Sequence, residues 1–376
     1  MLYLARPYLE EPDMTTTPVP PRVDHDGTSE RDGHGDEEPI DVVHVGLGPI
    51  GRQVLEYVTG RRRYRSVGAV DIDPDLAGRP LRDMLGADTD AGPGGDAPGP
   101  EVRVAADVGE LGPARPGAVA VHCAGSSLER VAPSLRALLA AGYHVVSTCE
   151  ELSYPWASQH ELATELDRVA RANGLVVLGT GVNPGYSMDY LPVVMAAAQR
   201  SVRGVGVHRV QDAGQRRLPL QRKVGAGLGV DEFAERVREG SIRHVGLPES
   251  ARIIDRALRL GCTDFTETID PLVASSPVAF GGGTVAAGHV LGIDQQVLGT
   301  RGGDTVIRLH LQMAVGLDDP RDVITLDGEP GLETVVRGLH GDAATAAVVV
   351  NSLGRVRVAA PGLRTVDEIP ASPLNL

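Results

Sequence analysis

The chain has 376 residues, 42% hydrophobic and only 3% aromatic, which is enough for two domains with cores built mostly from Ala, Val and Leu. A formal net charge of −14 argues against nucleic-acid binding, and no apolar run approaches the roughly 18 residues of a membrane-spanning helix. Three cysteines fit neither a disulfide framework nor a metal site. The first residues do not resemble a signal peptide, so we expect a cytoplasmic protein without a metal.

Residues 1–40 differ in composition from the rest of the chain. They hold ten acidic residues against three arginines, together with many Pro, Gly and Thr residues. Such a segment has too little apolar surface to offset the conformational entropy that it would lose on folding. We therefore expect a disordered acidic tail at 1–40.

From residue 41 to 185, strand and helix patterns alternate. An apolar strand at 41–48 precedes a helical pattern at 50–58 and a second strand at 66–73. After a Pro- and Gly-rich loop at 87–100, further short strands alternate with amphipathic helices that each end in a glycine. This alternation predicts a dinucleotide-binding domain at 41–185, with a doubly wound parallel sheet of the Rossmann type.

Residues 186–339 have a different pattern. Longer alternating strands are expected at 204–213, 241–247, 305–316 and 322–328, with helices at 230–240 and 248–261. This predicts a second α+β domain with an open, mainly antiparallel sheet, which we assign to substrate binding; the family resemblance described below implies that it also serves dimerisation. The nearly polar-free helix at 341–356 must be buried, and we expect the segment 340–376 to return to the first domain.

The first strand ends in a glycine motif, Gly46-x-Gly48-x-x-Gly51, which also includes Pro49 and Ile50. In a strand–turn–helix context, the first glycine permits a tight turn, the second lets the backbone approach a pyrophosphate, and the third allows close helix packing. A purely structural turn is the alternative, but the context predicts a nucleotide site.

The acid 20 residues after Gly51 bears on the choice of cofactor. Asp71 ends the second strand, where a carboxylate accepts hydrogen bonds from the adenosine ribose and repels a 2′-phosphate. We therefore expect NAD, with NADP possible because the arginine cluster at 61–65 precedes this strand. Solvated surface charge is the other explanation of that cluster.

Two later strands end in residues that could contact a cofactor or act in catalysis. Ala124, Gly125 and Ser126 would face the nicotinamide ribose, or form a plain turn. The next strand ends in Thr148, which we expect at the cofactor, followed by Glu150 and Glu151. A partly buried carboxylate at this edge could act as a general base, whereas two solvated loop charges are the alternative.

The last strand of this domain ends in "LGTGVNPGYSMD", residues 178–189. The Asn183 amide could bind the cofactor carboxamide or the substrate. Asp189 could bind a substrate amine, or could simply stabilise the start of the next helix.

Several blocks resemble 2,4-diaminopentanoate dehydrogenase and the native amine dehydrogenases, a group whose N-terminal domain is like that of dihydrodipicolinate reductase. The blocks are "VGLGPIGRQV", "VVSTCEELSYPW", "LGTGVNPGYSMDYLP", "HRVQDAGQRRLPLQRKVGAG" and "GDAATAAVVVNSLGRVRVAAPGLRTVDEIP". Together they span roughly residues 41–370.

The resemblance implies NAD(P)-dependent oxidative deamination of an amine to a ketone and ammonia, or the reverse reductive amination, by a homodimer. It assigns the catalytic carboxylate to Glu150, with Glu151 as the next candidate. Lys223, the only lysine of the chain, is a candidate for binding a substrate carboxylate, or else lies in a surface loop or dimer contact. The alternatives are an imine or carbonyl reductase of the same superfamily and a non-catalytic NAD-binding sensor.

Overall fold

The computed structural model of the chain describes residues 38–86, 98–99, 101–215 and 218–372. The expected disordered tail, except for its last three residues, and nearly all of the loop at 87–100 lie outside the described residues. From Glu38 onward the chain forms one compact unit, so the division near residue 185 stays a prediction.

The first sheet is parallel throughout and has seven strands in the order β15-β6-β5-β4-β1-β2-β3. Its central strands are short runs of Val, Ala and His that are buried on both faces, as expected of a parallel sheet between two layers of helices. The strands are β1 (Ile40–Val45), β2 (Tyr64–Val70), β3 (Val104–Ala105), β4 (Val119–His122), β5 (His144–Ser147), β6 (Val176–Gly179) and β15 (Gly362–Arg364).

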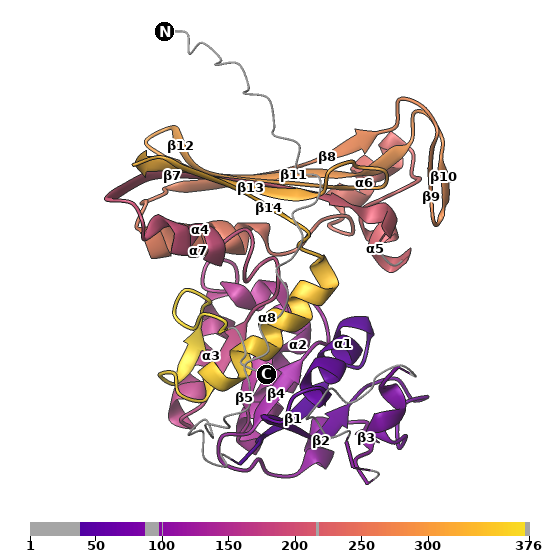
Figure 1. The fold of residues 1–376 in the computed structure, drawn as a ribbon, viewed down its shortest axis with the longest axis vertical. Coiled ribbons are helices and arrows are strands. Elements are labelled where there is room, and N and C mark those ends of the chain that lie inside the picture. The colour runs from indigo at the N-terminus through magenta and orange to yellow at the C-terminus, as the bar shows by residue number, and fades with distance from the viewer. Residues whose placement is uncertain (1–37, 87–97, 100, 216–217, 373–376) are drawn as a thin grey trace, which may run out of the picture. The chain divides into compact units, whose positions relative to one another are not determined.

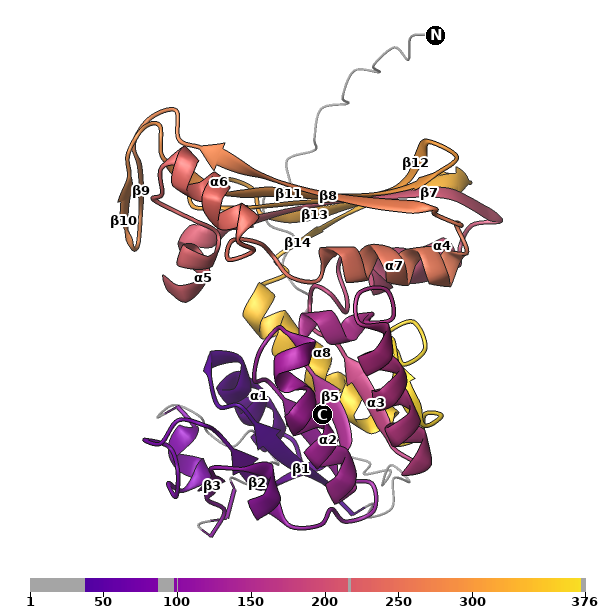
Figure 2. The same cartoon turned by 180° about the vertical axis from the view of Figure 1, so that it is seen from behind.

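Helices cover both faces of this sheet (Figures 1 and 2). Neighbouring residues of β1 point to opposite faces: Val42 joins the core under α1 and α8, whereas Val43 joins the core under α2 and α3. Helix α8, in which eleven of 16 residues are Gly, Ala, Val or Leu, packs against α1. The helices are α1 (Pro49–Thr59), α2 (Leu128–Ala141), α3 (His160–Ala172) and α8 (Gly341–Val356), with short 3-10 turns η1 (Leu81–Met84), η2 (Val108–Leu111) and η3 (Glu150–Ser153).

The second sheet has six strands in the order β14-β13-β7-β12-β11-β8 and is antiparallel except for the β7–β12 pair. A parallel Rossmann-like sheet joined to a mainly antiparallel one confirms the predicted fold class. The strands are β7 (Ser201–Asp212), β8 (Asp264–Val273), β11 (Val290–Arg301), β12 (Asp304–Ala314), β13 (Arg321–Glu329) and β14 (Leu332–Arg337), with a separate hairpin of β9 (Val278–Phe280) and β10 (Gly283–Val285).

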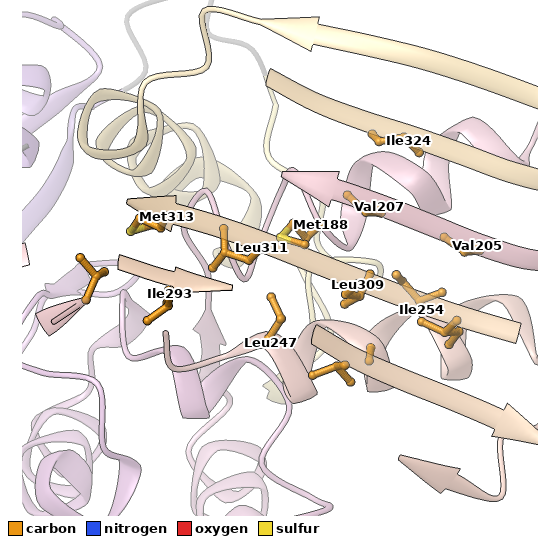
Figure 3. Close-up of a cluster of buried hydrophobic side chains, with 14 of the residues drawn as sticks. Met188, Val205, Val207, Leu247, Ile254, Ile293, Leu309, Leu311, Met313 and Ile324 are labelled. Atoms are coloured by element: carbon orange, nitrogen blue, oxygen red, sulfur yellow. The ribbon is translucent and has the colours of Figure 1, made fainter. Parts of the chain in front are cut away.

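One face of the second sheet packs against helices α4 and α7 (Figures 1 and 2). Alternate residues of β12, Leu309 and Leu311, lie in one buried cluster with Leu247 and Ile254 of α7, as Figure 3 shows. The helices of this part are α4 (Tyr190–Ala196), α5 (Leu218–Lys223), α6 (Val230–Arg238) and α7 (Leu247–Leu258), with η4 (Ala213–Gln215).

The opposite face of this sheet carries a polar network. The rings of His208 and His310 stack with centroids 4.3 Å apart, and Asp294 lies 2.7 Å from His310 and accepts a hydrogen bond from Gln312. His208 Nε2 contacts Gln312 and His310 Nε2 contacts Asp294, so both of these contacts lie within the sheet and favour a structural role for the two histidines.

The strand expected at 241–247 is wrong, because this segment is a loop that leads into α7. The side chain of Gln295 takes the place of a strand partner: it accepts a hydrogen bond from His244 N and donates one to His244 O. Gly246 then adopts a left-handed conformation, φ 107°, directly before α7. Among the described residues, no helix is both long and apolar enough to cross a membrane.

Candidate active site

A cavity of about 340 Å³ lies at the carboxyl edge of the parallel sheet. Its walls come from the turns that follow β1, β4, β5 and β6, and from β7, α5, the loop before α7 and the start of α8. This is the edge at which doubly wound sheets bind their ligands.

The three glycines of the first turn have different surroundings. A Cβ at Gly46 would lie 2.8 Å from the Cys123 carbonyl oxygen, and one at Gly51 would lie 1.9 Å from the Gly46 oxygen, so both positions require glycine. Gly48 has no neighbour within 4 Å of such a Cβ. Gly48, Pro49 and Ile50 line the cavity at the start of α1, so the open backbone faces the place where a pyrophosphate would bind.

Asp71 lies beside this turn but outside the cavity lining. Its carboxylate accepts hydrogen bonds from Leu47 N at 2.6 Å and from Asp73 N at 2.9 Å. It therefore holds the glycine turn against the end of β2, a tether that sequence reasoning did not anticipate. Binding of the ribose at Asp71 stays a prediction.

The arginine cluster lies at the other edge of the sheet. Ile40 N, at the start of β1, donates a hydrogen bond to Arg63 O at 2.8 Å, whereas the glycine turn follows the end of β1. This position argues against the alternative in which the cluster at 61–65 reaches a cofactor phosphate.

The turns after β4 and β5 contribute Gly125, Ser126 and Thr148 to the cavity. Ala124 does not line it, because its Cα packs near Gly46 instead. Cys149 is buried, which raises the pKa of its thiol to about 12, so a thiolate nucleophile is not available there near neutral pH.

Glu150 lines the cavity at the first position of η3. Burial raises the pKa of its carboxyl group, whereas the nearby Lys223 ammonium and a hydrogen bond from the Ser126 hydroxyl lower it in part. The raised pKa places Glu150 closer to the range in which a carboxylate can take up and release a proton during turnover.

Glu151, the neighbouring residue, does not line the cavity. Its Oε2 accepts hydrogen bonds from Leu128 N at 2.8 Å and from Gln159 Nε2 at 2.7 Å. The carboxylate thus stabilises the first turn of α2. Of the two candidate bases, the geometry favours Glu150.

Asn183 is buried, 8% exposed, and lines the cavity. Within the described residues, neither its Oδ1 nor its Nδ2 has a hydrogen-bond partner, and the hydroxyl of Thr180, which lines the same cavity, also has none. A buried amide without partners costs free energy, so this end of the cavity suits a ligand with both a donor and an acceptor. A nicotinamide carboxamide has both, and the residues present therefore fit that group.

Asp189 is completely buried and lies outside the cavity lining. Its two oxygens accept hydrogen bonds from Gly185 N, Tyr190 N and the Ser250 hydroxyl, at 2.6 to 2.8 Å. The structure therefore favours the alternative role, in which Asp189 stabilises the start of α4.

The second sheet adds residues that sequence reasoning missed: Arg209, Gln211 and Met313 line the cavity from β7 and β12. Arg209 Nη1 contacts both oxygens of Asp322 at 2.6 Å and donates to the Ser187 hydroxyl. The sequence of β7 does contain an indication of this position. Val205 and Val207 are alternate residues that face the core, and Arg209 is the next residue on the same side of the strand.

Lys223 and Arg243 complete this side of the cavity. Lys223 ends α5, while Arg243 belongs to the loop before α7 and forms an ion pair with Glu267 at 3.3 Å. Arg216 and Arg217, which share a sequence block with Lys223, lie outside the described residues. The cavity thus has a carboxyl group near the expected cofactor site and cationic groups on the side of the second sheet.

Comparisons with known proteins bear on the family and the fold. A family model described as the 2,4-diaminopentanoate dehydrogenase C-terminal domain matches residues 186–374. The 2,4-diaminopentanoate dehydrogenase of Acetoanaerobium sticklandii is 29% identical over 341 residues, which are 89% of this chain and 94% of that protein. The solved structure of an amine dehydrogenase from Mycobacterium smegmatis, 22% identical, has a similar fold, with a TM-score of 0.76 over 91% of this chain and 99% of that one.

Proposed function

The chain belongs to the 2,4-diaminopentanoate dehydrogenase family, and from this premise we propose that it is an NAD(P)-dependent amine dehydrogenase. In the oxidative direction, R₂CH–NH₃⁺, NAD(P)⁺ and water yield R₂C=O, NH₄⁺, NAD(P)H and H⁺. The reverse reaction is the reductive amination of a ketone.

The position of Glu150 carries this proposal. Its half-buried carboxyl group lines the same cavity as the open glycine turn and the unpartnered Asn183 amide. A base at this place can act on a substrate held between the cofactor site and the second sheet.

The residues of the chain then have separate tasks. The glycine turn would hold the pyrophosphate, and Asn183 would orient the nicotinamide, which when bound accepts a hydride from the carbon that carries the amine. Glu150 takes the proton from the substrate ammonium, because a protonated amine does not release hydride. After it releases this proton to solvent, which is the H⁺ of the overall reaction, the ionised carboxylate assists the addition of water to the substrate imine.

Two environmental effects suit Glu150 to this work. Burial keeps its pKa raised, so that proton exchange with an amine is less costly than from an ordinary glutamate. Once ionised in a partly dry site, it also stabilises the positive charge of the imine more strongly than it could in water.

The cationic side of the cavity bears on the substrate. Arg209, Lys223 and Arg243 line it from the second sheet and its loops, which suits an amine that also carries a carboxylate, as 2,4-diaminopentanoate does. We keep Lys223 as the candidate for this contact, with simple alkyl amines as the other class of substrate.

We further propose NAD as the preferred cofactor, because the turn after β2 holds the carboxylates of Asp71 and Asp73 and would repel a 2′-phosphate. A homodimer, which the family resemblance implies, and a cytoplasmic location, which the low cysteine content favours, remain part of the proposal. Sedimentation of the full chain measures the oligomeric state.

The test is amine-dependent formation of NADH, and the reverse reaction with ketone and ammonium. Turnover that requires ammonium in the reductive direction supports the proposal. Reduction of a cyclic imine or ketone without ammonium would instead favour a reductase, and cofactor binding without turnover of any amine, imine or ketone would favour a sensor.

A further inference from the structure

A second, smaller cavity lies between the edge strand β8, the start of α7 and the turn after η3. Its volume is about 190 Å³, and its charged lining residues are Glu249, Arg252 and Glu267. Tyr154, Ser158 and Thr266 add hydroxyl groups. Cavities that hold drug-sized ligands are larger, about 300–1,000 Å³, so this one suits a small ion with a few waters.

Glu249 is the unusual residue of this cavity. It is only 8% exposed, and its Oε2 has no hydrogen-bond partner in the described part of the chain. Burial raises the pKa of its carboxyl group to about 7. A buried carboxyl oxygen without a donor is unfavourable, and a cation with N–H groups would satisfy it.

The other charged lining residues already have partners. Glu267 pairs with Arg243 at 3.3 Å and accepts a hydrogen bond from Gln295 at 2.8 Å. The guanidinium of Arg252 lies 3.9 Å from the centre of the Phe265 ring. This cation–π contact stabilises the charge of Arg252, which therefore does not need a carboxylate partner. Glu249 is therefore the carboxyl group that this cavity leaves for a ligand.

The two cavities share a wall. Arg243 lines the active-site cavity, while its ion-pair partner Glu267 lines the second one. Gly246, three residues before Glu249, touches the active site from the same segment: a Cβ there would lie 3.1 Å from the Cβ of Glu150. The segment 243–248 therefore touches Glu150 and leads directly to Glu249.

We propose that the second cavity is an ammonium site, in which the Glu249 carboxylate and neighbouring hydroxyls bind NH₄⁺ beside the active site. This rests on the proposed function, which makes ammonium a substrate or product. Three cationic side chains and two carboxyl groups line the active-site cavity, whereas two carboxyl groups and one arginine line the second cavity, so the second cavity is the more favourable place for a cation. A divalent metal is a poorer occupant, because no group of three potential ligands occurs among the described residues.

The first test measures binding without catalysis. The melting temperature of the full chain is compared in ammonium chloride and sodium chloride at equal ionic strength, with tetramethylammonium chloride as a cation that has no N–H group. We expect ammonium to raise Tm by about 2 °C at tenfold excess over Kd. Glu249→Gln should abolish this difference, whereas Glu161→Gln, an exposed glutamate on α3, should retain it.

The second test is kinetic. In reductive amination, Glu249→Gln should lower kcat/KM for ammonium by about tenfold or more, with KM for the ketone unchanged at saturating ammonium. Ala157→Leu places a larger side chain at the exposed rim of the cavity without changing its charge. This variant should also lower kcat/KM for ammonium. Folding of both variants is checked by Tm in sodium chloride.

The outcomes separate this site from the proposed function. An ammonium-specific rise in Tm that Glu249→Gln removes, in a protein inactive on all amines, would uphold the site and overturn the proposed function. The ammonium site is overturned if wild type shows no ammonium-specific rise in Tm, or if both cavity variants keep the wild-type kcat/KM for ammonium.

Discussion

Two adjacent glutamates, Glu150 and Glu151, offer a sharp test because the structure gives them different tasks. Glu150 lines the active-site cavity, and its pKa is raised by burial. Replacing it by Gln keeps the shape of the side chain but removes the group that takes up a proton. General-base catalysis contributes about 10²–10⁴-fold, so we expect Glu150→Gln to lower kcat by that factor without changing the Kd of the cofactor.

The neighbouring variant, Glu151→Gln, should instead affect stability. Its carboxylate accepts hydrogen bonds from Leu128 N and Gln159 Nε2 at the start of α2. Loss of the negative charge at this helix N-terminus weakens both contacts, and we expect the free energy of unfolding to fall by about 1 kcal/mol. The kcat should stay within about threefold of wild type, since the carboxylate does not reach the cavity.

Both variants are measured with the same three assays: NADH formation from an amine by absorbance, cofactor Kd by fluorescence titration, and urea unfolding. The expected pattern is a loss of kcat for Glu150→Gln and a loss of stability for Glu151→Gln. The opposite pattern, or an equal loss of kcat in both, would refute the assignment of the base to Glu150.

Three further outcomes follow from the described contacts. Lys223→Met removes a charge that lowers the pKa of Glu150, so the acidic limb of kcat/KM for deamination, which requires ionised Glu150, should shift to higher pH; an unchanged pH profile would contradict the coupling. Asp189→Ala removes the acceptor of three buried hydrogen bonds and should lower the unfolding free energy in urea by about 3 kcal/mol; a loss under about 0.5 kcal/mol would show that these contacts matter little. Asp71→Ser should reduce the ratio of kcat/KM for NAD over NADP, measured with both cofactors, and a ratio that stays at the wild-type value would exclude Asp71 from cofactor choice.

The Rossmann-like part of the fold was predictable because its signals are local. Gly46 and Gly51 occupy places where a Cβ would clash with backbone atoms, and such a requirement leaves glycine in the sequence at a fixed spacing. The apolar helix 341–356 likewise required burial, and its bounds agree with those of α8.

The misassigned segment and residues depend on contacts distant in sequence. The segment 241–247 has a strand-like pattern, but Gln295, about 50 residues later, binds its backbone and replaces a strand partner. The sequence around Asp189 is compatible with binding a substrate amine, but the Ser250 hydroxyl, 61 residues later, donates a hydrogen bond to its carboxylate. No local pattern records such partners.

The residues on the second sheet show the same limit for the active site. Arg209 faces the cavity only because β7 pairs with β12 and places it at the end of an inward-facing row. Glu150 and Glu151 are adjacent in sequence, and only the capping of α2 by Glu151 distinguishes them. Sequence reasoning could therefore locate the edge of the sheet where the site lies, but not the full set of side chains that face it.

The proposed reaction of this cavity is the oxidation of a carbon that bears an amine. The most direct measurement is the initial rate of NADH formation by the full chain with 2,4-diaminopentanoate and a panel of alkyl amines, followed by the reverse reaction with the matching ketone in the presence and absence of ammonium. We expect amine-dependent NADH formation and ketone reduction that requires ammonium. Reduction of ketones or cyclic imines without ammonium, together with no turnover of any amine, would contradict it.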